Sequence, residues 1–241
     1  MGKYEKGNTK MKKTIMAIGG HIGDMELTCG GVLATMSLAG HQIITVALTG
    51  GEKGNPPHLD VATYRKQKED EAKTFAEMLG GISVVLPYQD GELPNDDKVR
   101  FEVCDLIRKY KPNILITHWK HSMHKDHETT SKIVKDAQFY AGIPGFKREN
   151  EPHFAAGPYY AENWEDPEGF HPYLYVKVSE EGYKLWQKAI DTHWFATQSK
   201  SFKYKEYYEA LMIVRGKEAR ALYAEAFDIE YTSKKIIRDS F

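Results

Sequence analysis

The sequence of 241 residues predicts an α/β protein with a Rossmann-like, mostly parallel sheet that is flanked by helices. Short apolar runs alternate with longer segments of helical periodicity as far as Gly142. Such alternation implies right-handed crossovers between parallel strands, with helices on both faces of the sheet. A hydrophobic fraction of 41% is enough for the core of one large domain.

The first strand and the first helix are separated by a glycine-rich turn. Residues 14–19 form an apolar run that is typical of a buried strand, and the Gly19-Gly20 pair gives it a tight exit. Apolar residues at helical spacing then predict a helix over residues 24–39. Gly40 is a natural end for that helix.

The next two strands follow the same plan. Residues 42–49 and 82–86 are apolar runs that predict the second and third strands. Between them, Asp60 or Thr63 is expected to cap a long helix that ends at Leu79.

The fourth strand is expected over residues 113–117, between two helices. Residues 98–110 place their apolar side chains on one face of a helix, and residues 125–141 form the helix that follows the strand.

The pattern changes after Gly142. Residues 143–172 hold five prolines, so we expect ordered loops with one strand over 154–160. A strand over 173–178 and helices ending at Thr192 and spanning 204–221 follow. We therefore expect a flexible lead-in over 1–12 and one domain over 13–241, in which the aromatic-rich region 143–241 is a lid or flank on the same core.

Composition and charge exclude several classes of protein. The formal net charge of −1 gives no basis for a nucleic-acid partner. No apolar run approaches the roughly 18 residues of a membrane span. Cys29 and Cys104 lie far apart, which favours two buried thiols in a cytoplasmic protein over a disulfide framework.

A histidine-rich segment directly follows the fourth predicted strand. His118, His121, His124 and His127 fall within ten residues, together with Asp126. Imidazole is the commonest metal ligand and titrates near neutral pH. Ligands in open α/β sheets bind just outside the carboxyl ends of the strands, so the segment predicts a metal or proton-transfer site.

The turn after the first strand offers matching groups at a neighbouring sheet edge. His21 and Asp24 flank the entry to the helix, so both side chains can point to one spot. Together with His124, Asp126 and His127 they allow a shell of two histidines and one aspartate. Three protein ligands with an open position are typical of catalytic zinc. His118 and His121 are expected to line the site.

These two motifs resemble those of the PIG-L / LmbE-like metal-dependent deacetylases of N-acetylglucosaminyl compounds. The family motif Ala-His-Pro-Asp-Asp-Glu corresponds to His21-Ile-Gly-Asp24-Met-Glu26, and His-Pro-Asp-His corresponds to His124-Lys-Asp126-His127. Weaker similarities extend along nearly the whole chain, including the helix segment that contains Arg65 and the Asp90-Gly91 pair.

The resemblance implies a role for each matching residue. His21, Asp24 and His127 would bind the metal, which is expected to be Zn²⁺, although Fe²⁺ suits the same donors. His124 would stabilise the oxyanion and Asp126 would orient a histidine.

On the same resemblance, Arg65 and Asp90 would help to bind a small N-acetylated sugar. The resemblance and the aromatic-rich tail are also compatible with a homo-oligomer.

The sequence departs from the family motif at the presumed general base. Gly23 stands where the family has that aspartate, and Ile22 replaces the proline. Loss of a positioned base typically lowers a rate by about 10²–10⁴. Asp126, Glu26 or Glu52 could replace it; alternatively the enzyme hydrolyses a different, more labile amide or ester, or the protein binds metal and sugar without turnover.

Aromatic side chains in the last third could stack on a sugar. Tyr159, Tyr160, Trp164 and Trp194 are the candidates, with core packing as the alternative for each. The competing class for this fold is a dinucleotide-binding module, but the first turn lacks the GxGxxG pattern.

Overall fold

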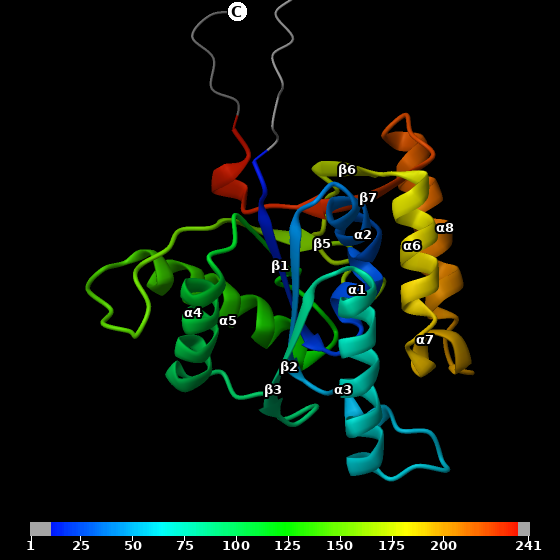
Figure 1. The fold of residues 1–241 in the computed structure, drawn as a ribbon, viewed down its shortest axis with the longest axis horizontal. Coiled ribbons are helices and arrows are strands. Elements are labelled where there is room, and N and C mark those ends of the chain that lie inside the picture. The colour runs from blue at the N-terminus through cyan, green and yellow to red at the C-terminus, as the bar shows by residue number, and fades with distance from the viewer. Residues whose placement is uncertain (1–10, 236–241) are drawn as a thin grey trace, which may run out of the picture.

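The computed structural model describes residues 11–235 and confirms the α/β prediction. Its centre is a seven-stranded sheet with the order β3-β2-β1-β4-β5-β7-β6 (Figure 1). The five strands from β3 to β5 are parallel, whereas β7 runs antiparallel to both β5 and β6. The strands are β1 (Thr14–His21), β2 (Gln42–Thr49), β3 (Ile82–Tyr88), β4 (Ile114–His118), β5 (Ala156–Ala161), β6 (Leu174–Val178) and β7 (Tyr223–Asp228).

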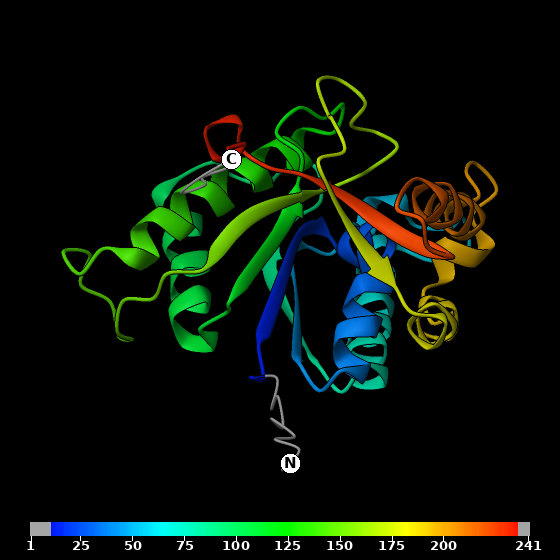
Figure 2. The same cartoon turned by 90° about the horizontal axis from the view of Figure 1, so that it is seen from above.

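Helices cover both faces of the sheet, as the alternation predicts. Helices α4 and α5 cover one face and α1, α2 and α3 the other, with α6 and α8 beyond α2 and the antiparallel strands (Figure 2). The helices are α1 (Asp24–Thr28), α2 (Gly30–Leu38), α3 (Val61–Met78), α4 (Asp97–Tyr110), α5 (Lys125–Gly142), α6 (Glu180–Ile190), α7 (Trp194–Gln198) and α8 (Tyr204–Glu218), with short 3-10 turns at η1 (Glu52–Gly54) and η2 (Tyr231–Ser233).

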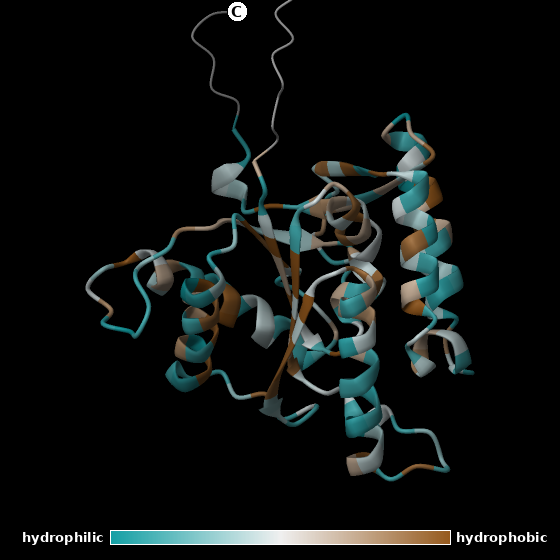
Figure 3. Cartoon of the chain, in the orientation of Figure 1, coloured by the Kyte–Doolittle hydropathy of each residue, from teal (hydrophilic) through white to brown (hydrophobic). Residues whose placement is uncertain are grey.

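Each face of the sheet has its own apolar core. Met16 and Ile18 of β1 pack with Val103 and Ile107 of α4, and Ile15 and Ala17 alternate to the other side. The strands are accordingly apolar while the outer faces of the helices are polar (Figure 3). Alternating burial on two faces fixes the register of β1, which in turn fixes where its last residue, His21, emerges.

The predicted helix over residues 24–39 is instead two helices, and this prediction was wrong in that detail. Cys29 separates α1 from α2 with an extended φ of −139°. Next to the break, the lack of a side chain at Gly30 lets Trp186 of α6 approach the backbone, because a Cβ there would lie 2.4 Å from the Trp186 ring. The Trp186 indole donates a hydrogen bond to the Glu26 carbonyl at 2.7 Å.

The C-terminal third is built into the sheet as well as lying beside it. It supplies β5, β6 and β7, and of these the sequence did not predict β7. The helix predicted over 204–221 ends at Glu218. Residues 1–10 of the predicted lead-in lie outside the described residues. Among the helices of residues 11–235, none combines the length and apolar character needed to cross a membrane.

Glu225 of β7 joins the C-terminal third to the start of α2, and its loss should destabilise the fold. Its two carboxylate oxygens accept hydrogen bonds from the backbone N–H groups of Gly31 and Val32 at 2.8 and 2.7 Å. Glu225→Gln leaves one buried donor without an acceptor, which costs about 1–3 kcal/mol of unfolding free energy.

Chemical denaturation measures this cost. The matched control is Glu77→Gln on the solvent side of α3, where the side chain is 63% exposed and the change should stay within about 0.5 kcal/mol. Equal stability of the two variants would contradict the role of Glu225.

Candidate metal centre

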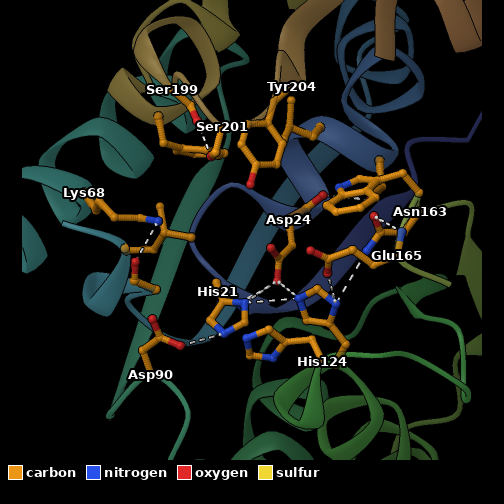
Figure 4. A pocket seen from close by; sticks show the side chains of 18 of the residues that line it. His21, Asp24, Lys68, Asp90, His124, Asn163, Glu165, Ser199, Ser201 and Tyr204 are labelled. Carbon is orange, nitrogen blue, oxygen red and sulfur yellow. Dashed lines mark hydrogen bonds and ion pairs between the residues drawn. The ribbon is translucent and has the colours of Figure 1, made fainter. Parts of the chain in front are cut away.

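The carboxyl ends of three neighbouring strands bring the polar groups of the site together. His21 is the last residue of β1, His118 is the last residue of β4, and Asn163 and Glu165 follow β5. Since β1, β4 and β5 are adjacent and parallel, these ends share one edge of the sheet. A cavity of about 350 Å³ opens there (Figure 4).

The three residues predicted to bind metal form a compact triangle of donor atoms. His21 Nδ1 lies 3.2 Å from Asp24 Oδ2 and 3.1 Å from His127 Nε2, and the third side, from Asp24 to His127, is 3.3 Å. Zinc bonds of about 2.0–2.1 Å at tetrahedral angles place neighbouring donors about 3.3 Å apart. The triangle therefore has the size of one face of a zinc coordination tetrahedron.

Charge is concentrated at this triangle. Burial disfavours the charged form of His21, but Asp24 and the hydrogen-bonding carboxylates around it outweigh that effect and hold its pKa well above the usual value. Burial would likewise raise the pKa of Asp24, yet His127, His21 and His118 hold it well below the usual value. Asp24 is thus an anion in a buried cluster of imidazoles, which is an arrangement that a cation stabilises.

The carboxylates of Asp90 and Asp126 contact the nitrogen of His21 that is not part of the triangle, Nε2. Asp90 Oδ1 lies 3.1 Å and Asp126 Oδ2 lies 3.5 Å from His21 Nε2, on the side opposite the triangle. Asp126 in turn accepts a 2.6 Å hydrogen bond from the Gly91 N–H. These contacts fit the predicted orienting role of Asp126, because a proton on Nε2 leaves Nδ1 free to ligate.

A further carboxylate, that of Glu165, contacts the nitrogen of His127 that is not part of the triangle. Glu165 Oε2 is 3.3 Å from His127 Nδ1, and Asn163 Nδ2 is 3.5 Å from the same nitrogen. Asn163 is itself held by the Tyr208 hydroxyl at 2.8 Å. A proton on Nδ1 shared with Glu165 again leaves the other nitrogen, Nε2, for a metal.

His124 faces the cavity in a defined tautomer. Its Nδ1 accepts the backbone N–H of Asp126 at 3.2 Å and so caps helix α5. The proton of the neutral ring must therefore be on Nε2, beside His21, whose ring centroid is 4.5 Å away. Burial, with the neighbouring charges of His21 and His127, lowers the pKa of His124. The ring is a neutral hydrogen-bond donor at pH 7.

The other two histidines of the segment differ from each other. His118 is buried, lies 3.0 Å from Asp24 Oδ2 and stacks on His127 with ring centroids 3.9 Å apart. Burial, together with the charge of His127, lowers the pKa of His118 to about 4. His121 is exposed beside Trp119 and does not line the cavity.

Gly23 is required by its backbone and by its neighbour. Its φ is +105°, a conformation that L-residues rarely adopt, and an added Cβ would lie 2.2 Å from the Phe195 ring of α7. Phe195 therefore occupies the space into which the family's aspartate would project. Two of the substitutes considered for that base are engaged elsewhere: Glu26 accepts the Gly23 N–H at 3.0 Å, and Glu52 accepts the Asp90 N–H at 3.0 Å.

We expect Gly23→Ala to be more destabilising than an equivalent change at Gly40. Both glycines have positive φ, +105° and +87°, so alanine costs about 1–3 kcal/mol of strain at either site. Gly23 has a ring where the methyl group would stand, whereas at Gly40 no atom of residues 11–235 lies within 4 Å of that position. Urea denaturation of both variants measures the difference, and Phe195→Ala should reduce it. Equal losses would show that Phe195 does not fill the position.

Only some of the residues predicted to bind the sugar line the cavity. Asp90 lines the cavity, while Arg65 lies in a separate hollow and its guanidinium is held by Glu69, Tyr88 and Leu86. Their roles in sugar binding stay predictions. Trp164 and Trp194 line the cavity, but Tyr159 and Tyr160 do not.

The cavity-lining residues that sequence reasoning missed include Lys68, Asn163 and Glu165. A signal existed for two of them. Because residues 154–160 were expected to form a strand, the polar residues directly after it could have been placed at the same sheet edge. Lys68 has no such signal, since a lysine in a charged helix reads as solvent-exposed.

The fold and the site together define an α/β protein with a candidate metal centre at the carboxyl edge of its parallel strands. Residues 16–138 match the family profile described as PIG-L, GlcNAc-PI de-N-acetylase. That match covers both histidine motifs and half of the chain. The chain belongs to the PIG-L family.

Individual relatives differ in what they are named for. A diacetylchitobiose deacetylase of Thermococcus kodakarensis is 27% identical over 193 residues, 75% of this chain and 69% of that protein. A 4-oxalmesaconate hydratase of Pseudomonas putida is 24% identical over 219 residues, 87% of this chain and 82% of that protein.

A solved structure shares the whole fold. The 4-carboxy-2-hydroxymuconate hydratase of Pseudomonas putida superposes with a TM-score of 0.83 at 20% identity, over 96% of this chain and all of that one.

Proposed function

We propose that the protein is a metal-dependent hydrolase that removes the acetyl group from an N-acetylated sugar of the GlcNAc type. The observation that carries the proposal is the triangle of His21, Asp24 and His127, whose donor atoms are 3.1 to 3.3 Å apart at the wall of a cavity. The family match and the deacetylase relative supply the reaction class.

The donor set fits zinc, and also Fe²⁺. Two imidazole nitrogens and one carboxylate oxygen, each supported by a further hydrogen-bonding group, are a common catalytic set. When bound there, the metal supplies Lewis acidity toward the acetyl carbonyl and lowers the pKa of a water. The residues Asp90, Asp126 and Glu165 keep the two histidines oriented for it.

Three side chains of the protein would stabilise the oxyanion, hold a water and orient a metal ligand. His124 presents Nε2–H to the cavity and is placed to donate to the oxygen that becomes negative as the amide is attacked. Glu165 contacts His127 and also lines the cavity, so it is the carboxylate placed to hold a water there. Asp126 is fully buried and outside the cavity lining, which favours its orienting role over proton transfer.

Acetate release tests the proposal directly. The zinc-loaded protein is incubated with N-acetylglucosamine, diacetylchitobiose and their glycosides, and free amine and acetate are quantified. Release that is lost on chelation and restored by zinc supports the proposal. A fully metallated protein that binds these sugars without releasing acetate would instead be a binding homologue, and cleavage of other amides or esters alone would change the substrate class.

A hydratase is the second candidate, favoured by Gly23. This chain lacks the carboxylate expected of the family's deacetylases, and the relative that covers 87% of it is named a hydratase. The test is addition of water to an unsaturated carboxylic acid, measured as loss of the absorbance of its conjugated double bond. If this hydration occurs and acetate release does not, the hydratase replaces the deacetylase as the proposed function.

Metal binding should release a proton near neutral pH. The pKa of His21 is raised in the metal-free protein, so its proton is bound at pH 7 and must leave before Nδ1 can ligate. Apparent zinc affinity should therefore increase as pH rises and level off above the pKa of His21. Calorimetry in buffers of different ionisation enthalpy should give about one proton released per zinc at pH 7. Identical heats in all buffers would contradict the raised pKa.

A further inference from the structure

Lys68 of α3 is a buried ammonium group at the cavity wall. The residue is only 5% exposed, and its side chain lines the same cavity as the candidate metal centre (Figure 4). Nζ donates one hydrogen bond, to the Gly51 carbonyl at 3.2 Å, and lies 4.6 Å from the centre of the Phe195 ring. An ammonium group has three N–H donors, so this leaves donor capacity unused.

Lys68 forms no direct ion pair in the part of the chain that the structure describes, although the carboxylates of Asp24, Asp90, Glu71 and Glu26 act on its charge from beyond ion-pair distance. No carboxylate there lies within ion-pair distance of its Nζ, whereas Arg65, one turn earlier, contacts both Glu52 and Glu69. Buried charges in proteins are usually paired, because an isolated one loses its hydration without compensation. A cation that is buried at a cavity and unpaired therefore indicates that the missing anion comes from the ligand.

A second unsatisfied group lies beside Lys68. Among residues 11–235 the Tyr64 hydroxyl has no hydrogen-bond partner; it is buried in the wall of the same cavity, one helical turn before Lys68. Residues four apart lie on the same face of a helix. The face of α3 at the cavity thus carries an ammonium group with free donors, which suits the several oxygens of a carboxylate or phosphate, and an unsatisfied hydroxyl in the wall next to it.

We propose that Lys68 anchors an anionic group, a carboxylate or a phosphate, on the substrate that reacts at the metal centre. The inference rests on the proposed function only in using the same cavity, since an anionic substrate fits both a deacetylase and a hydratase. It makes Lys68 a specificity-determining residue that distinguishes anionic substrates from neutral ones.

A purely structural role makes a different prediction. If Lys68 only fastened the Gly51 carbonyl of the η1 loop, its replacement would weaken all ligands alike. As a binding residue it should affect only ligands that carry the anion. The discriminating quantity is therefore the ratio of affinities for an anionic compound and its neutral counterpart.

The experiment measures that ratio in the zinc-loaded full chain. N-acetylglucosamine 6-phosphate is compared with N-acetylglucosamine, and fumarate with its dimethyl ester, by quenching of the fluorescence of Trp164 and Trp194, which line the cavity. The variants are Lys68→Met, which keeps the length, and Lys68→Arg, which keeps the charge. Lys66→Met, at an exposed position of the same helix, is the matched control.

The wild type and Lys66→Met should bind the anionic member of one pair at least about tenfold more tightly, as expected for a hydrogen bond to a charged group. Lys68→Met should lose this preference and Lys68→Arg should keep most of it. The pair that shows the preference identifies the anion as phosphate or carboxylate. No preference in the wild type, or an equal preference in Lys68→Met, overturns the inference.

These outcomes are independent of turnover. Preferential binding without acetate release would support the role of Lys68 while refuting the deacetylase. Efficient deacetylation of neutral sugars, without tighter binding of the anionic compounds, would support the deacetylase and refute the role of Lys68. If Lys68→Met does not fold, Lys68→Gln takes its place as the uncharged variant, and absence of any preference in the wild type still overturns the inference.

Discussion

Exchange of His127 for alanine is expected to abolish zinc binding at the centre and to lower activity by more than about 10³-fold, because the several kcal/mol of charge stabilisation supplied by a metal are lost. His127 Nε2 is one corner of the donor triangle, 3.1 Å from His21 and 3.3 Å from Asp24. Alanine leaves two of the three donors of the triangle, fewer than the three-ligand pattern of catalytic zinc.

The control comes from the same loop. His121→Ala removes an imidazole that is exposed and lies outside the cavity lining, so zinc content and rate should stay at the wild-type level. Zinc is measured after dialysis by atomic absorption, and activity by acetate release. Stoichiometric zinc in His127→Ala, or an equal loss in His121→Ala, would show that the donor triangle is not the metal site.

Replacement of His124 by asparagine should lower kcat by about 10²–10³ while zinc remains bound, as expected when one oxyanion donor is removed. His124 has two separable tasks, since Nδ1 caps helix α5 and Nε2–H faces the cavity. Asparagine is a good N-cap residue, so it preserves the first task. Its shorter side chain cannot present a donor where Nε2 stands.

The variant therefore separates catalysis from folding. The melting temperature and zinc content of His124→Asn should match the wild type, and the loss should appear in kcat with KM little changed. Because the pKa of His124 is lowered, the wild-type ring is neutral at pH 7. As the pH is reduced from 7 to about 6.5, protonation of His124 should therefore not decrease the rate. A rate unchanged in His124→Asn would remove this residue from the reaction.

Phe195 occupies the space beside Gly23, where the family motif has an aspartate. Because Phe195 fills the space beside Gly23, a carboxylate cannot be restored at that position by one substitution. Two carboxylates other than Asp24 line the cavity beside the expected metal ligands: Asp90 next to His21, and Glu165, which follows β5, next to His127. Both Phe195, which fills the space at residue 23, and Glu165 belong to the C-terminal third of the chain.

Local patterns predicted the first half of the fold well. Apolar runs bounded by glycine or polar residues gave β1 to β4, and Asp60 caps α3 as one of the two expected residues, with its side chain accepting the Thr63 N–H. The errors came where long-range packing decided the backbone. The break at Cys29 accompanies the approach of Trp186, and β7 pairs with β5 and β6, which are distant in sequence.

The sequence by itself determined the chemical groups of the site and their positions at strand ends, because strand periodicity and parallel topology are local properties with a common geometric consequence. It thereby indicated His21, Asp24, His124 and His127 before their distances were known. Only the tertiary structure decided that Phe195 closes the space at Gly23, that Glu165 contacts His127, and that Lys68 lines the cavity without an ion pair among residues 11–235. Those contacts join residues far apart in the chain, and packing between elements, which no local pattern encodes, sets them.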